Sequence, residues 1–297
     1  MKQVVWMFSG LGSQRYNMGD KLLRNDPIFR ETMEHCDEIV KPLLHGSLLE
    51  AIYLTKSKSF EEFVDIRFVS PALFSVQYSL AQSLLAKGHR PDYLVGYSLG
   101  EYVAYVLAGI LDLEDCLHSL IHLAQLAQEY CQPAAMIAIL NVPEIISQIA
   151  EPFEAFDLAA INFDTNFVVT GPREAAAMLL VHLSKRDIIA QILPVEYGFH
   201  SHLIEPMKEP YLKQLQKIPW QQPQFNVVSA CQANVLPQIE LEDFWRVLRN
   251  PIDFRHTITF LKRLGDCEFV DFSPSGTMAN FIKYDGRLNS PIVCSLI

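Results

Sequence analysis

The chain has 297 residues, which is enough for one large domain or two unequal ones. Half of its residues are hydrophobic and 20% are charged, a balance that favours a sizeable core and argues against a largely disordered chain. A formal net charge of −10 argues against nucleic acid as a partner.

The first predicted element is a strand over residues 4–8. Its apolar run is too short for a signal peptide or a membrane span, so we expect a cytoplasmic protein with no membrane partner. The strand leads into a loop, Ser9–Gln14, where Gly10 and Gly12 would let backbone N–H groups approach a ligand. An ordinary strand-to-helix turn would have the same composition, and that interpretation stays open.

Helical segments are predicted to follow as far as about residue 68, and one of them has Asp26 as its N-cap and Pro27 at its first position. A further helix is predicted to begin with Ser70 as cap and Pro71 in its first turn. Its apolar repeat ends before Gly88, which is expected to terminate it.

The next stretch has the pattern of a nucleophile elbow. A short apolar strand over 93–95 is followed by Gly96-x-Ser98-x-Gly100 and by a predicted helix over 99–107. Such a tight turn needs small residues on both sides of the serine, and it places the hydroxyl of Ser98 at a helix N-terminus. A purely structural turn is the alternative. A second long helix is expected over 113–130, capped by Asp112.

The middle of the chain changes pattern. Strands are predicted over 135–140, 156–161, 166–170 and 188–193, with helices over 143–150 and 173–185. This β-α-β-β-α-β order is the split βαβ arrangement. We therefore expect an α/β fold in which residues 1–132 and 195–297 form an α/β-hydrolase-like catalytic subdomain, and residues 133–194 form an inserted ferredoxin-like small subdomain.

The last part of the chain returns to the large subdomain through a glycine-containing segment that carries His200 and His202. A helix is expected from Ser201. The remaining predicted elements are a strand over 223–229, helices over 240–264 broken at Asn250-Pro251, a strand over 268–272 and a helix over 277–283.

A serine hydroxyl needs a base to become a good nucleophile. Of nine histidines, His200 and His202 lie at a predicted strand end, and those within predicted helices are more typical of packing or surface positions (His35, His118, His122, His182). The elbow would supply the backbone N–H of Leu99 to an oxyanion hole, and the Gly10–Gly12 loop could supply that of Leu11. A carbonyl freed near Asn250 could orient the histidine.

No metal or cofactor is expected. The six cysteines lie far apart, without C-x-x-C or metal-ligand spacing, and are expected to be reduced thiols of a cytosolic protein: Cys36, Cys116, Cys131, Cys231, Cys267 and Cys294.

Seven motifs spread over almost the whole chain resemble those of malonyl-CoA:acyl carrier protein transacylases and of polyketide synthase acyltransferases. They are FSGLGSQ (8–14), SPALF (70–74), GYSLGE (96–101), AIN with TG (160–162, 170–171), GFHS (198–201), RNP (249–251) and DFSPSG (271–276). The resemblance implies a Ser98–His200 dyad, an acyl-serine intermediate and phosphopantetheine thioesters as substrates, held on an acyl carrier protein. It also implies that Tyr97, Phe199, Asn162, Gly10 and Gly12 are in contact with the substrate.

Two departures from the family pattern concern the substrate's acyl group. The arginine that clamps a malonyl carboxylate in dicarboxyl-specific members is replaced by Leu123, and the histidine before the serine is replaced by Tyr97. No lysine or arginine occurs from residue 101 to residue 132. An unpaired carboxylate in an apolar pocket is costly, so malonyl is expected to be a poor substrate and a neutral acyl group a better one. A cation reaching the site from elsewhere in the chain is the alternative.

The family that these motifs resemble includes acyl hydrolases that lack this arginine and clear acyl groups from carrier proteins. We therefore expect a trans-acting acyl hydrolase of polyketide biosynthesis, with a transferase of non-malonyl groups as the alternative and an inactive docking subunit as a third hypothesis. An acidic carrier would need a local basic patch on this acidic chain. Candidates are Lys185-Arg186, Arg246 with Arg249, and Lys262-Arg263, each of which is also typical of an ordinary solvated face.

Overall fold

The computed structural model describes residues 2–53, 63–149, 153–285 and 292–295. Its larger sheet has the strand order β11-β10-β1-β2-β7-β8, and every neighbouring pair is parallel except β7–β8. The strands are β1 (Gln3–Phe8), β2 (Tyr93–Gly96), β7 (Asn226–Ser229), β8 (Asn234–Val235), β10 (Cys267–Asp271) and β11 (Ile292–Ser295). The parallel α/β sheet expected from the alternating pattern is confirmed.

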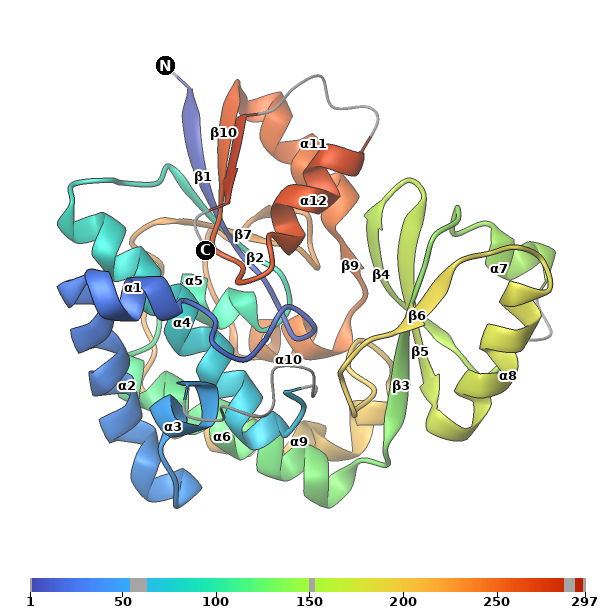
Figure 1. Cartoon of the computed structure of the whole chain (residues 1–297), viewed down its shortest axis with the longest axis horizontal. Coiled ribbons are helices and arrows are strands. Elements are labelled where there is room, and N and C mark those ends of the chain that lie inside the picture. Colours follow the sequence, from blue (N-terminus) through green and yellow to red (C-terminus); the bar gives the residue numbers. More distant parts are fainter. Residues whose placement is uncertain (1, 54–62, 150–152, 286–291, 296–297) are drawn as a thin grey trace.

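Helices surround this sheet (Figure 1). Those that precede the elbow are α1 (Asp20–Asn25), α2 (Pro27–Leu44), α3 (Leu48–Tyr53) and α4 (Ile66–Ala86). Those that follow it in the larger part are α5 (Gly100–Leu107), α6 (Leu113–Tyr130), the 3₁₀ helix η2 (His202–Met207), α9 (Lys208–Leu215), α10 (Leu241–Arg249), α11 (Phe254–Leu264) and α12 (Thr277–Tyr284). None of the described helices is long and apolar enough to cross a bilayer.

Helix α4 begins five residues before the predicted start, which corrects the assignment of Ser70 as its cap. The cap is Asp65, whose side chain accepts a hydrogen bond from the backbone N–H of Arg67 at 3.1 Å. Pro71 therefore lies inside the helix, where its missing N–H leaves the carbonyl one turn earlier without its usual partner. The predicted N-cap of α2 at Asp26 and the predicted end of α4 before Gly88 are confirmed.

The smaller sheet is antiparallel except at one edge and has the order β6-β3-β5-β4-β9. Its strands are β3 (Ala134–Ile139), β4 (Asp157–Phe163), β5 (Asn166–Pro172), β6 (Ala190–Ile192) and β9 (Ile252–Asp253), and its helices are α7 (Ile145–Gln148) and α8 (Arg173–Ser184). The β-α-β-β-α-β order is confirmed, although α7 is shorter than predicted. Strand β9 was not predicted, and it joins this sheet from beyond residue 195.

Alternation along β3 explains how the two sheets meet. Ala135, Ile137 and Ile139 belong to a small core that the sheet shares with α8, whereas Met136 belongs to the core of the larger part. Because successive side chains of a strand point to opposite faces, one face of the small sheet covers its own helices and the other packs toward the large sheet. The two sheets therefore form one packed body, in which the carboxyl ends of β1 and β2 face the smaller sheet (Figure 1).

Candidate active site

Ser98 lies in a strained turn between β2 and α5. Its φ of 55° is in the left-handed region, as expected at a nucleophile elbow. A Cβ on Gly96 would lie 2.2 Å from the Cα of Glu101, and one on Gly100 would lie 2.0 Å from the carbonyl oxygen of Phe8. Both flanking positions therefore require glycine, because the helix starts directly against the strands that precede it.

His200 is the histidine that the fold brings to Ser98. Its Nε2 lies 2.8 Å from Ser98 Oγ, and its ring is 3% exposed. His202, two residues further on, is instead exposed, and its Nδ1 lies 2.8 Å from Asp157 Oδ2 at the edge of the small sheet. The pattern left both histidines open, and the structure separates them.

The other ring nitrogen of His200 meets a backbone carbonyl. Nδ1 lies 2.8 Å from the carbonyl oxygen of Asn250, which follows α10 and precedes Pro251. Burial, against the opposing hydrogen bond to the Asn250 carbonyl and with a contribution from the positive charge of Arg249, lowers the pKa of His200 to about 4, so the imidazole is neutral at pH 7. A neutral ring whose Nδ1–H is held by a carbonyl presents Nε2 as a base to the serine hydroxyl.

The two residues predicted to supply the oxyanion hole both lie beside Ser98. Leu99 directly follows Ser98, and Leu11 lines the same pocket as both residues. Neither N–H donates to any other described residue. The loop that carries Leu11 is pressed against the elbow, since a Cβ on Gly10 would lie 2.8 Å from Ser98 Cβ. Gln77 holds this loop by accepting from Ser9 N at 2.7 Å, a role that the sequence did not reveal.

A small apolar pocket opens at Ser98. It has a volume of about 10 Å³, which is room for about one water molecule. Leu123 and Phe199, both predicted to contact the acyl group, line it. The other lining residues are Leu11, Ser70, Ser98, Leu99, Tyr102, Leu120 and Leu248, of which Ser70, Tyr102, Leu120 and Leu248 were not singled out from the sequence.

A larger pocket of about 190 Å³ shares Leu11 with the first and is lined in part by the small sheet. Gly10, Gly12, Tyr97 and Asn162, all predicted to contact the substrate, line it. The Tyr97 hydroxyl donates to Asn162 Oδ1 at 2.8 Å, and Asn162 Nδ2 donates to Asn166 Oδ1 at 2.6 Å. Asn166 was missed because its contact with Asn162 depends on the β4–β5 hairpin, in which Asn166 pairs with Phe163.

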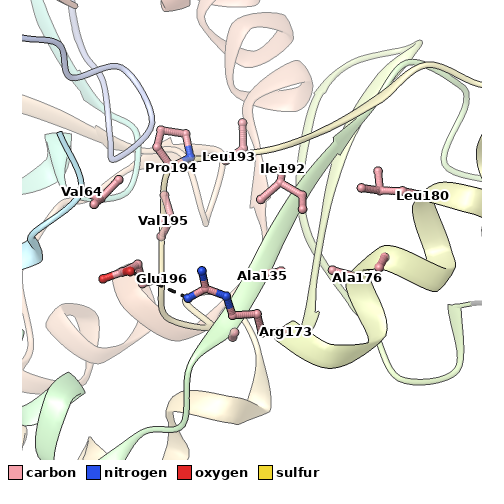
Figure 2. Close-up of a pocket in the computed structure, with 12 residues that line it drawn as sticks. Val64, Ala135, Arg173, Ala176, Leu180, Ile192, Leu193, Pro194, Val195 and Glu196 are labelled. Atoms are coloured by element: carbon pink, nitrogen blue, oxygen red, sulfur yellow. Dashed lines mark ion pairs between the residues drawn. The ribbon is translucent and has the colours of Figure 1, made fainter. Parts of the chain in front are cut away.

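Positive charge is absent from the described lining of both pockets. A third pocket of about 380 Å³, which shares Leu193 with the second, does contain a cation (Figure 2). This is Arg173, whose Nη1 lies 3.8 Å from Glu196 Oε1, as the dashed line in Figure 2 marks. Arg173 is therefore matched by a carboxylate and does not line either pocket beside the serine.

The basic patches predicted for a carrier protein are partly neutralised. Arg246 Nη1 lies 2.7 Å from Asp243 and Arg249 Nε lies 2.6 Å from Glu205. Lys185-Arg186 follow α8 and Lys262-Arg263 end α11, where all four side chains are exposed. The cysteines whose side chains are described are free thiols, as predicted, and Cys294 lies outside that set.

The fold and the Ser98–His200 contact define a class, the α/β proteins that carry a nucleophile elbow. Within that class the chain belongs to the acyl transferase domain family, whose model matches residues 5–292. It is 36% identical to the polyketide biosynthesis acyltransferase homolog PksD of Bacillus subtilis (strain 168), over 94% of this chain and 86% of that protein. It is 35% identical to the homolog BaeD of Bacillus velezensis (strain DSM 23117 / BGSC 10A6 / LMG 26770 / FZB42), with the same coverage.

A solved structure shows the same fold. The acyltransferase domain from the second module of the salinomycin polyketide synthase superposes with a TM-score of 0.87 at 25% identity, covering 99% of this chain and 69% of that one. The predicted combination of an α/β-hydrolase-like part with an inserted ferredoxin-like part is the two-part acyltransferase fold, and the family resemblance drawn from the motifs is confirmed.

Proposed function

We propose that this protein is a trans-acting enzyme of polyketide biosynthesis that removes neutral acyl groups from the phosphopantetheine thioesters of an acyl carrier protein. One observation carries the proposal: Ser98 Oγ lies 2.8 Å from a buried, neutral His200, beside two pockets with no positive charge among their described residues. Relatives named as polyketide biosynthesis acyltransferase homologs support the pathway.

The first half-reaction transfers the acyl group to the protein. Ser98 Oγ attacks the thioester carbonyl carbon while His200 Nε2 takes the hydroxyl proton. The carbonyl oxygen becomes an oxyanion held by the N–H groups of Leu99 and Leu11, and loss of one such donor typically costs about 2.7–4 kcal/mol. Collapse of this intermediate breaks the carbon–sulfur bond, and His200 returns the proton to the departing thiolate. An acyl-Ser98 ester and a free carrier thiol result.

The second half-reaction releases the acid. His200 takes a proton from a water molecule, whose oxygen attacks the ester carbonyl, and the proton then passes to Ser98 Oγ as the carbon–oxygen bond breaks. The Asn250 carbonyl holds Nδ1–H throughout and stabilises the imidazolium that forms in each half. No cofactor is required for either half.

Selectivity follows from the lining of the pockets. A charge-assisted pair with a carboxylate is worth about 1.5–3 kcal/mol, up to roughly a hundredfold in selectivity. Leu123 and Tyr97 offer no such pair, and the carboxylate of a malonyl group would also lose its hydration. Acetyl and other uncharged groups avoid both penalties. Without a partner for a carboxylate, the protein lacks the usual means of loading dicarboxylic extender units.

Transfer to a second carrier is the other candidate function. It shares the acyl-Ser98 ester and differs only in whether a thiol or water attacks it. The relatives are named as acyltransferase homologs, which favours this alternative. An inactive docking subunit is disfavoured because the serine, the histidine and the carbonyl that holds it are all in bonding distance.

The test is intact-protein mass spectrometry after mixing the protein with carrier protein loaded with acetyl or malonyl groups. We expect an acetyl adduct on wild-type protein, none on Ser98→Ala, and release of free acetate faster than transfer to a second carrier. Faster turnover of the malonyl carrier would contradict the neutral-acyl proposal. Acyl transfer without free acid would establish the transferase instead.

A further inference from the structure

A fully buried carboxyl group that the proposed reaction does not use lies one turn beyond the serine. Glu101 is 0% exposed, and its backbone N–H donates to the carbonyl oxygen of Ser98 at 2.9 Å. Its Oε2 accepts from the hydroxyl of Tyr105 at 3.1 Å, within the same helix. Its Oε1 points the other way, to the end of the neighbouring strand β7.

Two groups at the end of β7 donate hydrogen bonds to that carboxyl oxygen. Ser229 Oγ lies 2.8 Å from Glu101 Oε1, and the backbone N–H of Ala230 lies 3.2 Å from the same atom. Ser229 is 1% exposed, and its oxygen also accepts from the N–H of Cys231 at 3.3 Å. A short turn, residues 229–231, is therefore tied to the helix that begins at the serine.

The same turn is tied to the segment that holds the histidine. The carbonyl oxygen of Ala230 accepts from the N–H of Asp253 at 3.0 Å, and the thiol of Cys231 lies 3.7 Å from the carbonyl oxygen of Asn250. That carbonyl is also the partner of His200 Nδ1, at 2.8 Å. The contacts close a ring that runs from Ser98 through Glu101, the turn, Asn250 and His200 back to Ser98 Oγ.

We propose that Ser229 and Glu101 are positioning residues, which fix the separation of Ser98 Oγ and His200 Nε2 by bracing the nucleophile helix against the segment that carries Asn250. The inference rests on the proposed function only in that Ser98 and His200 are its reacting pair. Neither positioning residue lines either pocket beside Ser98, so each acts through Ser98 and His200. Small misplacements matter here, because about 1 Å can cost roughly a hundredfold in rate.

A matched control separates this brace from ordinary core stability. Ser229→Ala and Tyr105→Phe each remove one hydroxyl that donates to the Glu101 carboxyl, and both residues are fully or almost fully buried. Of the two, only Ser229 connects the helix that begins at Ser98 to the turn that contacts the Asn250 segment. Tyr105 belongs to the same helix as Glu101. Glu101→Gln is the conservative variant: burial raises the pKa of Glu101 to about 8, and an amide can still accept from Ser229 while donating to Tyr105.

The readout is the second-order rate at which a fluorophosphonate labels Ser98, measured across pH by mass spectrometry. This probe reports the reactivity of the serine and histidine whatever acyl group the protein prefers. We expect Ser229→Ala to slow labelling roughly tenfold at every pH where His200 is neutral. Tyr105→Phe and Glu101→Gln are expected to label at the wild-type rate, because neither removes a contact between the helix and the turn.

Equal labelling of Ser229→Ala and wild type, or equal slowing by Tyr105→Phe, would overturn the inference and leave the proposed function intact. Absence of labelling of Ser98 in wild-type protein would instead overturn the proposed function. If Ser229→Ala does not fold, Cys231→Ala removes the thiol contact to Asn250 and leaves the carboxyl's partners in place. It is expected to slow labelling about threefold, and an unchanged rate would contradict the brace.

Discussion

The two pockets that share Leu11 differ mainly in size, and both are lined mostly by apolar surface. The one that contains Ser98 has about 10 Å³ and is walled mostly by leucine and aromatic side chains. The one beside Tyr97 has about 190 Å³ and presents the amides and hydroxyls of Asn162, Asn166, Ser9, Ser13 and Thr277. This difference suggests a division of the substrate: the acyl group enters the small pocket, and the amide-bearing phosphopantetheine arm lies along the larger one, whose side-chain amides and hydroxyls can bond it.

Restoring a cation should reverse the preference of the small pocket. Leu123 is 4% exposed in α6 and lines the pocket with Ser98. With Leu123→Arg, the ratio of malonyl to acetyl kcat/KM should rise by up to about a hundredfold, because the guanidinium can pair with the malonyl carboxylate. Steady-state assays with the two loaded carriers measure this ratio.

Leu123→Met is the matched control, since it keeps a long apolar side chain without charge. The arginine variant should also unfold at a lower temperature in the absence of substrate, because a buried charge without a partner is destabilising. A folded Leu123→Arg protein with an unchanged substrate ratio would show that the acyl group does not enter this pocket.

The protonation of His200, the partner of Ser98 in the same pocket, gives a second test. Its pKa of about 4 means that the imidazole still acts as a base at pH 4.5, and that activity falls only as the pH drops through about 4. A histidine with its ordinary pKa of about 6.5 would have lost roughly fiftyfold or more at pH 4.5 by comparison. Fluorophosphonate labelling between pH 4 and 8 measures the midpoint, with circular dichroism at each pH as the control for unfolding.

The size of the small pocket can be changed without changing its charge. Leu120→Ala should raise the ratio of hexanoyl to acetyl turnover by about tenfold, because each methylene newly buried contributes about 0.8 kcal/mol. Leu126→Ala is the control, since Leu126 is equally buried in α6 but does not line the pocket. Both variants should lose about 2–5 kcal/mol of unfolding free energy. An equal change of chain-length preference in both would contradict the assignment of the acyl pocket.

The elements that make up this comparison differ in how far the sequence predicted them. The elbow was predicted because its glycine pattern is a local signal, whereas the strand end left His200 and His202 open and the family resemblance selected His200. Asn250 was predicted because proline breaks a helix. Strand β9 has two residues and no periodicity, so only the fold reveals that the small sheet extends beyond residue 195. The predicted start of α4 was wrong because Ser70-Pro71 has the pattern of a helix N-terminus, whereas Asp65 is the actual cap.

Side chains that act through pairing between strands were also beyond a local pattern. Asn166 meets Asn162 across a pair of antiparallel strands, and Ser229 meets Glu101 from a strand more than a hundred residues away in the sequence. Neither residue type nor spacing announces such a partner, because the register of the sheets creates it. The motif residues were therefore predictable, and the residues that hold them in place were not.

The smallest expected effect belongs to the larger pocket. Asn162→Ala should raise KM for a carrier-bound or free phosphopantetheine thioester by about twofold to tenfold with little change in kcat, because it removes one amide that can bond the arm. The same variant should turn over S-ethyl thioacetate, which has no amide groups, at the wild-type rate. Tyr97→Phe keeps the ring and releases the amide of Asn162 from its hydroxyl partner, so it should raise KM less. If Asn162→Ala slows both thioesters equally, the larger pocket does not hold the arm and the division of the substrate between the two pockets fails.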